Sequence, residues 1–327
     1  MVKLATFFVV SVFAAAQSAS LNFAEAVRLG EKSPRLYSLL ASWHGNVVLE
    51  QYFHGKRATS VANIKSASKS VLAMLIGIAI ERKLIPGVET PIATYFPEIA
   101  KDPARNGITV EDLLTMQSGL RSTSNRYYGA WVLSPNWVRH VLTRPVEADH
   151  GTRMIYSTGN THLLSAILTK TSKSSTWAFG QQALAKPLGF SLSQWPRDPQ
   201  GINFGGNDML LTPRQMLAIG ELYLHGGKRG DVQVVPSEWV RNSCTAHTIS
   251  PRNGDGYGYG WWLGEFGGVE TCYAWGFGGQ YIFVMPKLDL VIVATSSPNE
   301  GEDRRQQRGV VFDLVEEQIV PEIARAR

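Results

Sequence analysis

Cysteine is scarce in this sequence, which has only Cys244 and Cys272 among 327 residues. The sequence around them lacks the set of cysteine and histidine partners that a zinc site needs, which excludes a zinc site built on them. Neither cysteine lies in a motif typical of a thiolate nucleophile. They form either two thiols or one disulfide, because a sequence does not give the distance between two side chains.

Several motifs with well-defined chemistry are also missing. The sequence has no Gly-x-Ser-x-Gly elbow, no His-Glu-x-x-His pair, no phosphate-binding glycine loop and no internal repeat. Its basic residues are scattered, and the formal net charge is only +5. A nucleic-acid partner is therefore not expected, and nothing in the sequence calls for a metal or an organic cofactor.

A hydrophobic run that could span a membrane is missing after the first twenty residues. Those twenty have one early lysine, Lys3, an apolar run over residues 4–16 and small residues at its end. This pattern is typical of a secretory signal peptide, with a helix packed on the body as the alternative. No later run reaches the roughly 18 apolar residues of a membrane span. We expect a signal peptide over residues 1–20 and an exported bacterial protein, periplasmic or secreted, with no stable membrane anchor after signal removal.

The composition, with 44% hydrophobic and 18% charged residues, is that of an ordinary globular protein. Runs of β-branched and aromatic residues predict strands near both ends of the chain, with helices between them. This order predicts an α/β (α+β) fold: an antiparallel sheet built from both chain ends, flanked by helices, with an inserted helical region. We expect one domain over residues 21–327, with a sheet lobe at about 21–65 and 250–327 and a helical lobe at about 66–249. The predicted strands cover residues 37–43, 47–53, 257–262, 269–274, 280–285 and 290–296.

Helix starts and ends are marked by side chains that cap free backbone groups and by proline. Thr109, with Asp112 three residues later, begins one helix, and a capping box begins another at Thr212. A further helix is expected to be capped by Ser134, with Pro135 at its first position, and to end near residue 142. The remaining expectations are a helix over 161–172, a surface loop over 121–128 and a C-terminal helix over 302–320 that Pro321 ends.

The strongest chemical signal lies at the start of an apolar segment. Ser66 and Lys69 stand three residues apart, and residues 71–80 are all apolar or glycine. In a helix, three residues advance about 4.5 Å and leave both side chains on one face, so the Lys69 amine can reach the Ser66 hydroxyl. The apolar run is too short for a membrane span and predicts a buried core helix.

A serine hydroxyl becomes a useful nucleophile when a neighbouring base takes its proton. An amine can act as that base if burial lowers its pKa, and the apolar segment offers such burial. Ser66 would then lie at a helix N-terminus, where unpaired backbone N–H groups favour negative charge. The alternative is an ordinary helix start beside a solvated lysine, and the choice depends on partners elsewhere in the chain.

Two further motifs follow, Tyr156-Ser157-Thr158 and Ala274-Trp275-Gly276-Phe277-Gly278-Gly279. Together with Ser66-Ala67-Ser68-Lys69, they resemble the three motifs of the serine β-lactamase and penicillin-binding-protein superfamily. The resemblance is greatest to its class C-like branch, which also holds esterases, D-amino-acid peptidases and 6-aminohexanoate-dimer hydrolases. It extends from about residue 35 to the end, with similar stretches at 110–120, 154–168, 205–216 and 278–293.

The resemblance implies a role for each matched residue. Ser66 would be the acylated nucleophile, and Lys69 would bridge it to the Tyr156 phenol, so that Tyr156 or the two residues together take the proton. The backbone N–H groups of Ser66 and Phe277 would hold the oxyanion. The substrate-binding residues implied by the same motifs are Thr158, Trp275, Gly276, Gly278 and Gly279.

Departures from the family pattern bear on the substrate. Ala274-Trp275-Gly276 stands where relatives commonly have Lys-Thr-Gly, and Thr158 replaces an asparagine. The missing cation would cost a carboxylate-bearing substrate about 1.5 to 3 kcal/mol, unless Arg121 or Arg153 supplies the charge. An apolar acyl pocket is suggested instead by the aromatic residues at positions 127, 128, 275 and 277.

These residues together predict an exported serine hydrolase that cleaves a small-molecule ester or amide through an acyl-enzyme, with no metal or organic cofactor. A class C-like β-lactamase or a peptidoglycan DD-peptidase is the alternative on the same fold. A non-catalytic binding module is a third interpretation, which the intact Ser66, Lys69 and Tyr156 disfavour. The sequence leaves the oligomeric state open.

Overall fold

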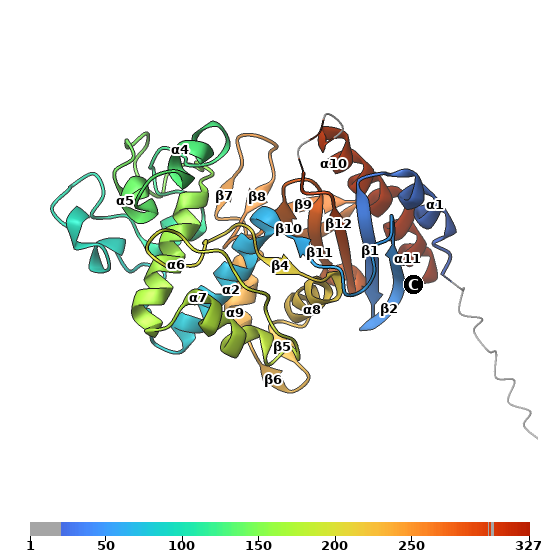
Figure 1. The fold of residues 1–327 in the computed structure, drawn as a ribbon. Coiled ribbons are helices and arrows are strands. Elements are labelled where there is room, and N and C mark those ends of the chain that lie inside the picture. The colour runs from blue at the N-terminus through green and yellow to red at the C-terminus, as the bar shows by residue number, and fades with distance from the viewer. Residues whose placement is uncertain (1–20, 300, 302–303) are drawn as a thin grey trace, which may run out of the picture.

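The computed structural model describes residues 21–299, 301 and 304–327 (Figure 1), so the predicted signal peptide lies outside the described residues. The strands are β1 (Leu36–Trp43), β2 (Asn46–Tyr52), β3 (Ala62–Asn63), β4 (Leu210–Leu211), β5 (Lys228–Arg229), β6 (Val232–Gln233), β7 (Thr248–Ile249), β8 (Gly256–Tyr257), β9 (Trp262–Phe266), β10 (Val269–Gly276), β11 (Gln280–Met285) and β12 (Leu290–Ser296). The α-helices are α1 (Ala24–Lys32), α2 (Ser68–Glu81), α3 (Val110–Leu114), α4 (Tyr128–Val132), α5 (Trp137–Leu142), α6 (Thr158–Ser172), α7 (Thr176–Gly180), α8 (Pro213–Leu224), α9 (Ser237–Ser243), α10 (Arg304–Asp313) and α11 (Val320–Ala326).

The main sheet joins the two ends of the chain. In the described part of the chain it has eight strands, in the order β2-β1-β12-β11-β10-β9-β8-β7, and its paired strands are antiparallel. β1, from near the start, pairs with β12, from near the end, so that Leu40 lies opposite Val293. The predicted sheet built from both chain ends is therefore confirmed, as is the hairpin formed by β1 and β2.

Both faces of the sheet are covered, which explains why its central strands are apolar at nearly every position. On β11, Ile282 and Val284 belong to the core that includes α2, α6 and α8, whereas Tyr281 and Phe283 belong to the core that includes α1, α10 and α11. Figure 1 shows the inserted helices on one side of the sheet and the terminal helices on the other. The sheet therefore holds α2, the helix that follows Ser66, in the interior.

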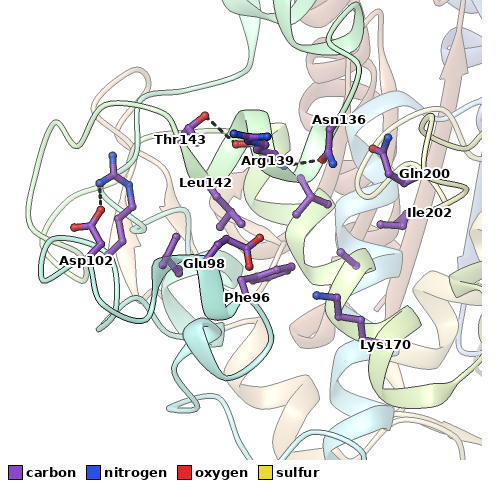
Figure 2. Close-up of a pocket in the computed structure, with 14 residues that line it drawn as sticks. Phe96, Glu98, Asp102, Asn136, Arg139, Leu142, Thr143, Lys170, Gln200 and Ile202 are labelled. Atoms are coloured by element: carbon purple, nitrogen blue, oxygen red, sulfur yellow. Dashed lines mark hydrogen bonds and ion pairs between the residues drawn. The ribbon is translucent and has the colours of Figure 1, made fainter.

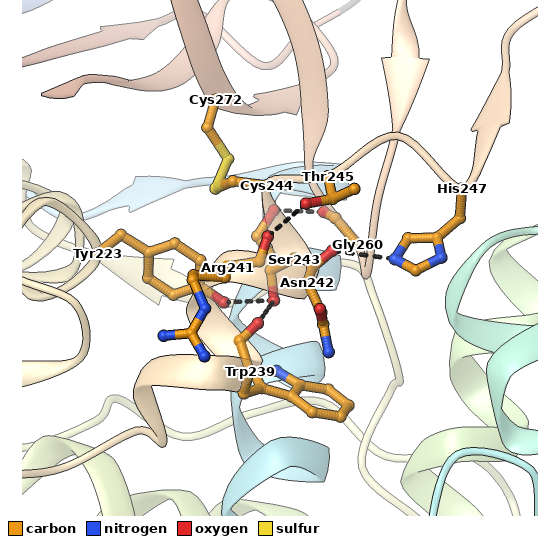
Figure 3. Close-up of a disulfide and its surroundings, with 11 residues drawn as sticks. Tyr223, Trp239, Arg241, Asn242, Ser243, Cys244, Thr245, His247, Gly260 and Cys272 are labelled. Atoms are coloured by element: carbon orange, nitrogen blue, oxygen red, sulfur yellow. Dashed lines mark hydrogen bonds between the residues drawn. A yellow bond between two sulfur atoms is a disulfide. The ribbon is translucent and has the colours of Figure 1, made fainter. Parts of the chain in front are cut away.

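A disulfide between Cys244 and Cys272 settles what the sequence left open. Figure 3 shows it joining the chain just after α9 to β10. Beside it, the Tyr223 hydroxyl donates to Ser243 Oγ at 3.2 Å, and Ser243 Oγ donates to Trp239 O at 2.7 Å. The disulfide ties the end of the helical region to the strand whose far end reaches the site.

The strand predicted over residues 257–262 is wrong. β8 ends at Tyr257 and β9 begins at Trp262, and the residues between them form a turn. Gly260 has φ +76°, and a Cβ at this position would lie 2.9 Å from Lys69 O. The chain turns here because glycine lets the backbone pass close to the central helix.

Two expectations about helix ends and one about a surface loop need correction. Asn136, rather than Ser134, caps α5: its side chain accepts from Arg139 N at 2.9 Å, while the Ser134 hydroxyl donates to Trp131 O. Pro321 does not end the C-terminal helix, because it lies in the first turn of α11, where a missing backbone N–H costs nothing. Residues 121–128 are only partly a surface loop, since Thr123 and Ser124 are buried. The helix α1 was not predicted, whereas the helix starts at Thr109 and Thr212 are confirmed, and both are capping boxes.

Candidate active site

Ser66 lies in a short 3-10 turn, Lys65–Ala67, that leads directly into α2. Two hydrogen bonds fix this turn. The Ser68 hydroxyl donates to Lys65 O at 2.6 Å, and Met209 N donates to Ser68 Oγ at 3.2 Å. Ser66 is thus held at the start of the central helix by a loop from a distant part of the chain.

Lys69 lies one helical turn after Ser66, with 2% of its surface exposed. Its Nζ donates to Ser66 Oγ at 3.2 Å, to Thr158 Oγ1 at 3.2 Å and to Gly206 O at 2.6 Å. Burial lowers the pKa of the Lys69 amine to about 7, and the negative charge of Asp208 opposes this effect. Near neutral pH, a large share of the amine is therefore unprotonated and can accept a proton.

A loop at residues 205–208 surrounds the stem of Lys69. Gly206 has φ +82°, and a Cβ there would lie 2.7 Å from Lys69 Cγ, so only glycine fits. Two residues later, Asp208 pairs with Lys65 Nζ at 3.0 Å. From the sequence, this stretch is identified only by its similarity to the superfamily, with no role predicted for it. The glycine pair at 205 and 206 was the signal that could have identified it.

Tyr156 meets both Ser66 and Lys69. The Lys69 Nζ lies over the Tyr156 ring, 5.2 Å from its centroid, so the amine contacts the phenol ring as well as the Ser66 hydroxyl. The predicted bridge from the amine to the phenol oxygen stays a prediction. Burial raises the pKa of Tyr156 to about 12, while a hydrogen bond with Ser66 and the charge of Arg252 act in the opposite direction. Tyr156 is therefore a neutral phenol near pH 7, next to the serine hydroxyl.

Thr158, at the start of α6, contacts the lysine. Its Oγ1 accepts from Lys69 Nζ and lies 2.9 Å from Ser124 Oγ, which also accepts from Thr158 N at 2.9 Å. Ser124 was missed because it falls in the segment expected to be a surface loop. The structure places Thr158 where it orients the amine, and its predicted contact with substrate stays a prediction.

The glycines after Trp275 fit the protein's own backbone. A Cβ at Gly276 would lie 2.0 Å from Ile64 O, so the missing side chain lets the segment before Ser66 dock on β10. Gly278 and Gly279 have φ +85° and +101° and form the turn into β11, a conformation that favours glycine. The predicted substrate contacts of these residues, and the predicted oxyanion site at the N–H groups of Ser66 and Phe277, stay predictions.

Two cavities meet at Ser66 and Tyr156. The first, here called the aromatic cavity, has a volume of about 200 Å³ and includes Tyr156, Trp262, Trp275 and Phe277 in its lining. The second has a volume of about 320 Å³ and a more polar lining. Both also contain Asn125 and Phe277, and the Phe277 side chain is 38% exposed. The first cavity is otherwise lined by Met154, Ser250, Pro251, Arg252, Trp262 and Trp275, and the second by Lys65, Ser124, Tyr128, Thr158, Asn207 and Pro298.

A family model described as Beta-lactamase matches residues 37–316. The chain belongs to the beta-lactamase family. This family member is 25% identical to the 6-aminohexanoate-dimer hydrolase of Paenarthrobacter ureafaciens over 303 residues, 83% of this chain and 76% of that protein. The superfamily predicted from the three motifs is therefore confirmed, and the chain is a member of a hydrolase family.

Solved structures show the same fold. The octameric penicillin-binding protein homologue from Pyrococcus abyssi has a TM-score of 0.70 at 21% identity, covering 88% of this chain and 74% of that chain. A family VIII carboxylesterase has a TM-score of 0.69 at 15% identity, covering 91% and 97%. The predicted β-lactamase/transpeptidase-like fold is thus confirmed for this family member.

The arginine that lines the aromatic cavity is Arg252, which was not considered from the sequence. Arg121 pairs with Glu147 at 2.6 Å, and Arg153 donates to Glu147 O at 2.9 Å, and neither lines the two cavities. Arg252, from the loop between β7 and β8, lines the aromatic cavity, and its positive charge acts to lower the pKa of Tyr156. Tyr127 is absent from both cavities and instead stacks with Arg126 and Arg144.

A third cavity lies in the helical region, and neither Ser66 nor Tyr156 lines it (Figure 2). Its volume is about 700 Å³, with Phe96 and Leu142 among its apolar residues and Glu98, Arg139 and Lys170 among its charged ones. This cavity is therefore separate from the Ser66 site.

Within the described residues, the protein has neither a cluster of metal-binding side chains nor a membrane-spanning helix. There, no three His, Cys, Asp or Glu side chains gather into a group that could hold a metal ion. No helix in residues 21–299, 301 and 304–327 is long and apolar enough to cross a membrane.

Proposed function

We propose that this protein is an exported serine hydrolase that cleaves an ester or amide through a covalent acyl-enzyme on Ser66. One observation carries the proposal: the Ser66 hydroxyl is shared between a buried amine, Lys69 Nζ at 3.2 Å, and the Tyr156 phenol. Nucleophile and base within hydrogen-bond reach, with a third group beside them, form the arrangement that covalent catalysis needs.

The pKa values favour Lys69 as the group that takes the first proton. Its pKa of about 7 lies near the working pH, whereas a Tyr156 pKa of about 12 leaves too little phenolate to act as the base. Ser66 Oγ then attacks the substrate carbonyl as its proton passes to Lys69 Nζ. The backbone N–H groups of Ser66 and Phe277 are proposed to hold the oxyanion.

Collapse of the tetrahedral intermediate breaks the bond to the leaving group. The leaving alkoxide or amine recovers the proton from Lys69, and the Tyr156 hydroxyl, hydrogen-bonded to Ser66, is placed to relay it. A water molecule then attacks the acyl carbonyl while Lys69 accepts a proton from it. The bond between the acyl carbon and Ser66 Oγ breaks, Lys69 returns the proton to Ser66 Oγ, and the acid product leaves.

The cavity linings favour an apolar acyl group. Met154, Trp262 and Trp275 line the space beside Ser66, and Trp275 follows Ala274 where relatives commonly have a lysine. Short esters and neutral amides are therefore the proposed substrates. Arg252 in the same cavity is the observation that keeps a second candidate, a carboxylate-bearing substrate of a β-lactamase or DD-peptidase.

Export is proposed from the pattern of residues 1–20, and the disulfide supports it. A disulfide such as Cys244–Cys272 persists in an oxidising compartment and is rare in a reducing cytosol. Expression in a bacterial host, followed by mass spectrometry of the N-terminus in the periplasmic fraction, tests the proposal. Recovery of only the uncleaved chain in the cytosol contradicts it.

The test of the chemistry uses one purified sample with chromogenic esters, anilides and a chromogenic cephalosporin. A fluorophosphonate probe should label the wild type at Ser66, and Ser66→Ala should lose both labelling and turnover. Ser70→Ala is the matched control, since it removes a serine hydroxyl close to Ser66 in the chain, a buried one in α2 that donates to Gly260 O at 2.6 Å. Turnover that survives in Ser66→Ala refutes the proposal, and absent labelling and turnover in a folded wild type favour a non-catalytic module.

A further inference from the structure

A fully buried histidine and carboxylate lie next to the loop that contacts Lys69. His162 Nε2 lies 3.0 Å from Asp198 Oδ2, and both side chains have no exposed surface. The other oxygen of Asp198 accepts from the backbone N–H groups of Gln200 and Ile202, at 2.9 and 2.8 Å. The carboxylate is therefore fixed by the chain around it, and it fixes the orientation of the imidazole.

The second ring nitrogen of His162 faces a backbone donor. Gly205 N–H donates to His162 Nδ1 at 3.3 Å, so Nδ1 carries no proton and Nε2–H donates to Asp198. Burial also lowers the pKa of His162, which keeps the ring neutral. A proton on Nδ1 would place two donors against each other. The neutral ring in this one tautomer is therefore the form that matches its surroundings.

The peptide held by His162 continues into the contact with Lys69. Gly206 follows Gly205, and its carbonyl accepts from Lys69 Nζ at 2.6 Å, the shortest of the three hydrogen bonds of this amine. Thr161, on α6, also contacts this loop, because its Oγ1 donates to Gly205 O at 3.1 Å. A Cβ at Gly205 would lie 2.5 Å from His162 Cα, so the loop backbone lies directly on α6.

From this geometry we infer that His162 is a positioning residue for the proposed base: oriented by Asp198, it holds the Gly205 amide so that the Gly206 carbonyl fixes the Lys69 amine beside Ser66. The inference rests on the proposed function. A purely structural role is the competing explanation, because the rings of Trp131, Trp137 and Phe204 pack around the imidazole at centroid distances from 5.3 to 6.3 Å.

Two amide substitutions separate the two roles of the ring. In His162→Asn, the side-chain oxygen can replace Nδ1 and accept from Gly205 N–H, whereas the contact with Asp198 is lost. In His162→Gln, the amide reaches the position of Nε2 and can donate to Asp198, whereas Gly205 loses its acceptor. Both variants remove the same ring from the same aromatic surroundings, so a packing defect affects both.

The measurements are kcat, KM and the pH profile of kcat/KM on a chromogenic ester from pH 5 to 9. His162→Gln should have a kcat about tenfold or more below that of His162→Asn, with KM changed less, because a misplaced base slows the chemical step. The acidic limb of this profile is the pH range in which kcat/KM rises as Lys69 loses its proton. Its midpoint should stay at the wild-type pH in His162→Asn and shift in His162→Gln, because only the second variant changes the surroundings of Lys69. The charged and titratable groups facing that amine, Asp208 and Tyr156, are the same in both variants.

Ser165→Ala is the matched control on the same helix. Ser165 Oγ is buried and donates to Asn203 O at 2.7 Å, two residues before Gly205. The Ser165→Ala variant should leave kcat and the acidic limb of the pH profile unchanged. If His162→Gln does not fold, Thr161→Val removes the hydroxyl bonded to Gly205 O and should move the limb instead. The inference is overturned if the two amide variants have the same kcat and the same midpoint of the acidic limb. It is also overturned if the midpoint in Thr161→Val is that of the wild type. Loss of the proposed function itself is distinguished by Ser66→Ala, which alone should abolish probe labelling.

Discussion

Replacing Lys69 with arginine tests the proposed base while keeping a long cationic side chain. Burial lowers the pKa of Lys69 from 10.5 to about 7. This shift means that the protein disfavours the charged amine relative to the neutral one by roughly 5 kcal/mol more than water does. About half of the amines are then neutral at pH 7. An arginine, with a pKa above 12, presents only about one neutral side chain in 10⁵ at that pH. Acylation should therefore fall by on the order of 10² to 10⁴.

The assay is the single-turnover acylation rate with a p-nitrophenyl ester between pH 5 and 9. The wild-type rate should rise about tenfold per pH unit below 7 and level off above it, because only the neutral Lys69 accepts the proton. Tyr156, with a pKa of about 12, should add no second limb in this range. A wild-type rate that is flat from pH 5 to 8, or a Lys69→Arg rate within tenfold of wild type, refutes the reasoning. Lys69→Ala serves as the control for the loss of the side chain.

Three other outcomes are expected. Tyr156→Phe should slow acylation by about 10² or more at an unchanged melting temperature, and full activity in this variant would exclude the phenol from proton transfer. Replacing Cys244 and Cys272 with serine should lower the free energy of unfolding in urea by about 2–4 kcal/mol; an unchanged midpoint would show that the disulfide adds no stability. Arg252→Ala should leave neutral esters unaffected and raise the KM of a carboxylate-bearing ester about tenfold or more, and equal losses on both would deny Arg252 a role in charge recognition.

The fold could be predicted because its signals are local. Strands β11 and β12 are bounded by glycine, Pro286 and a polar end, and their apolar runs gave both their extent and their burial. The segment over residues 257–262 misled because alternating aromatic residues and glycines have strand-like composition, while the turn there depends on contact with Lys69 O. Ser124 was missed for a similar reason: a polar segment gives no sign of burial until α6 packs over it.

The sequence by itself determined that Ser66 and Lys69 share one helix face, since their spacing and the apolar run after them are properties of a single segment. It also determined the family, through three motifs in a fixed order. Only the tertiary structure decided the state of the amine: its burial, its contact with the Tyr156 ring and its acceptor at Gly206 come from residues 87 to 137 positions away. A pKa depends on the solvent and charges around a group, and folding brings these together from distant parts of the chain.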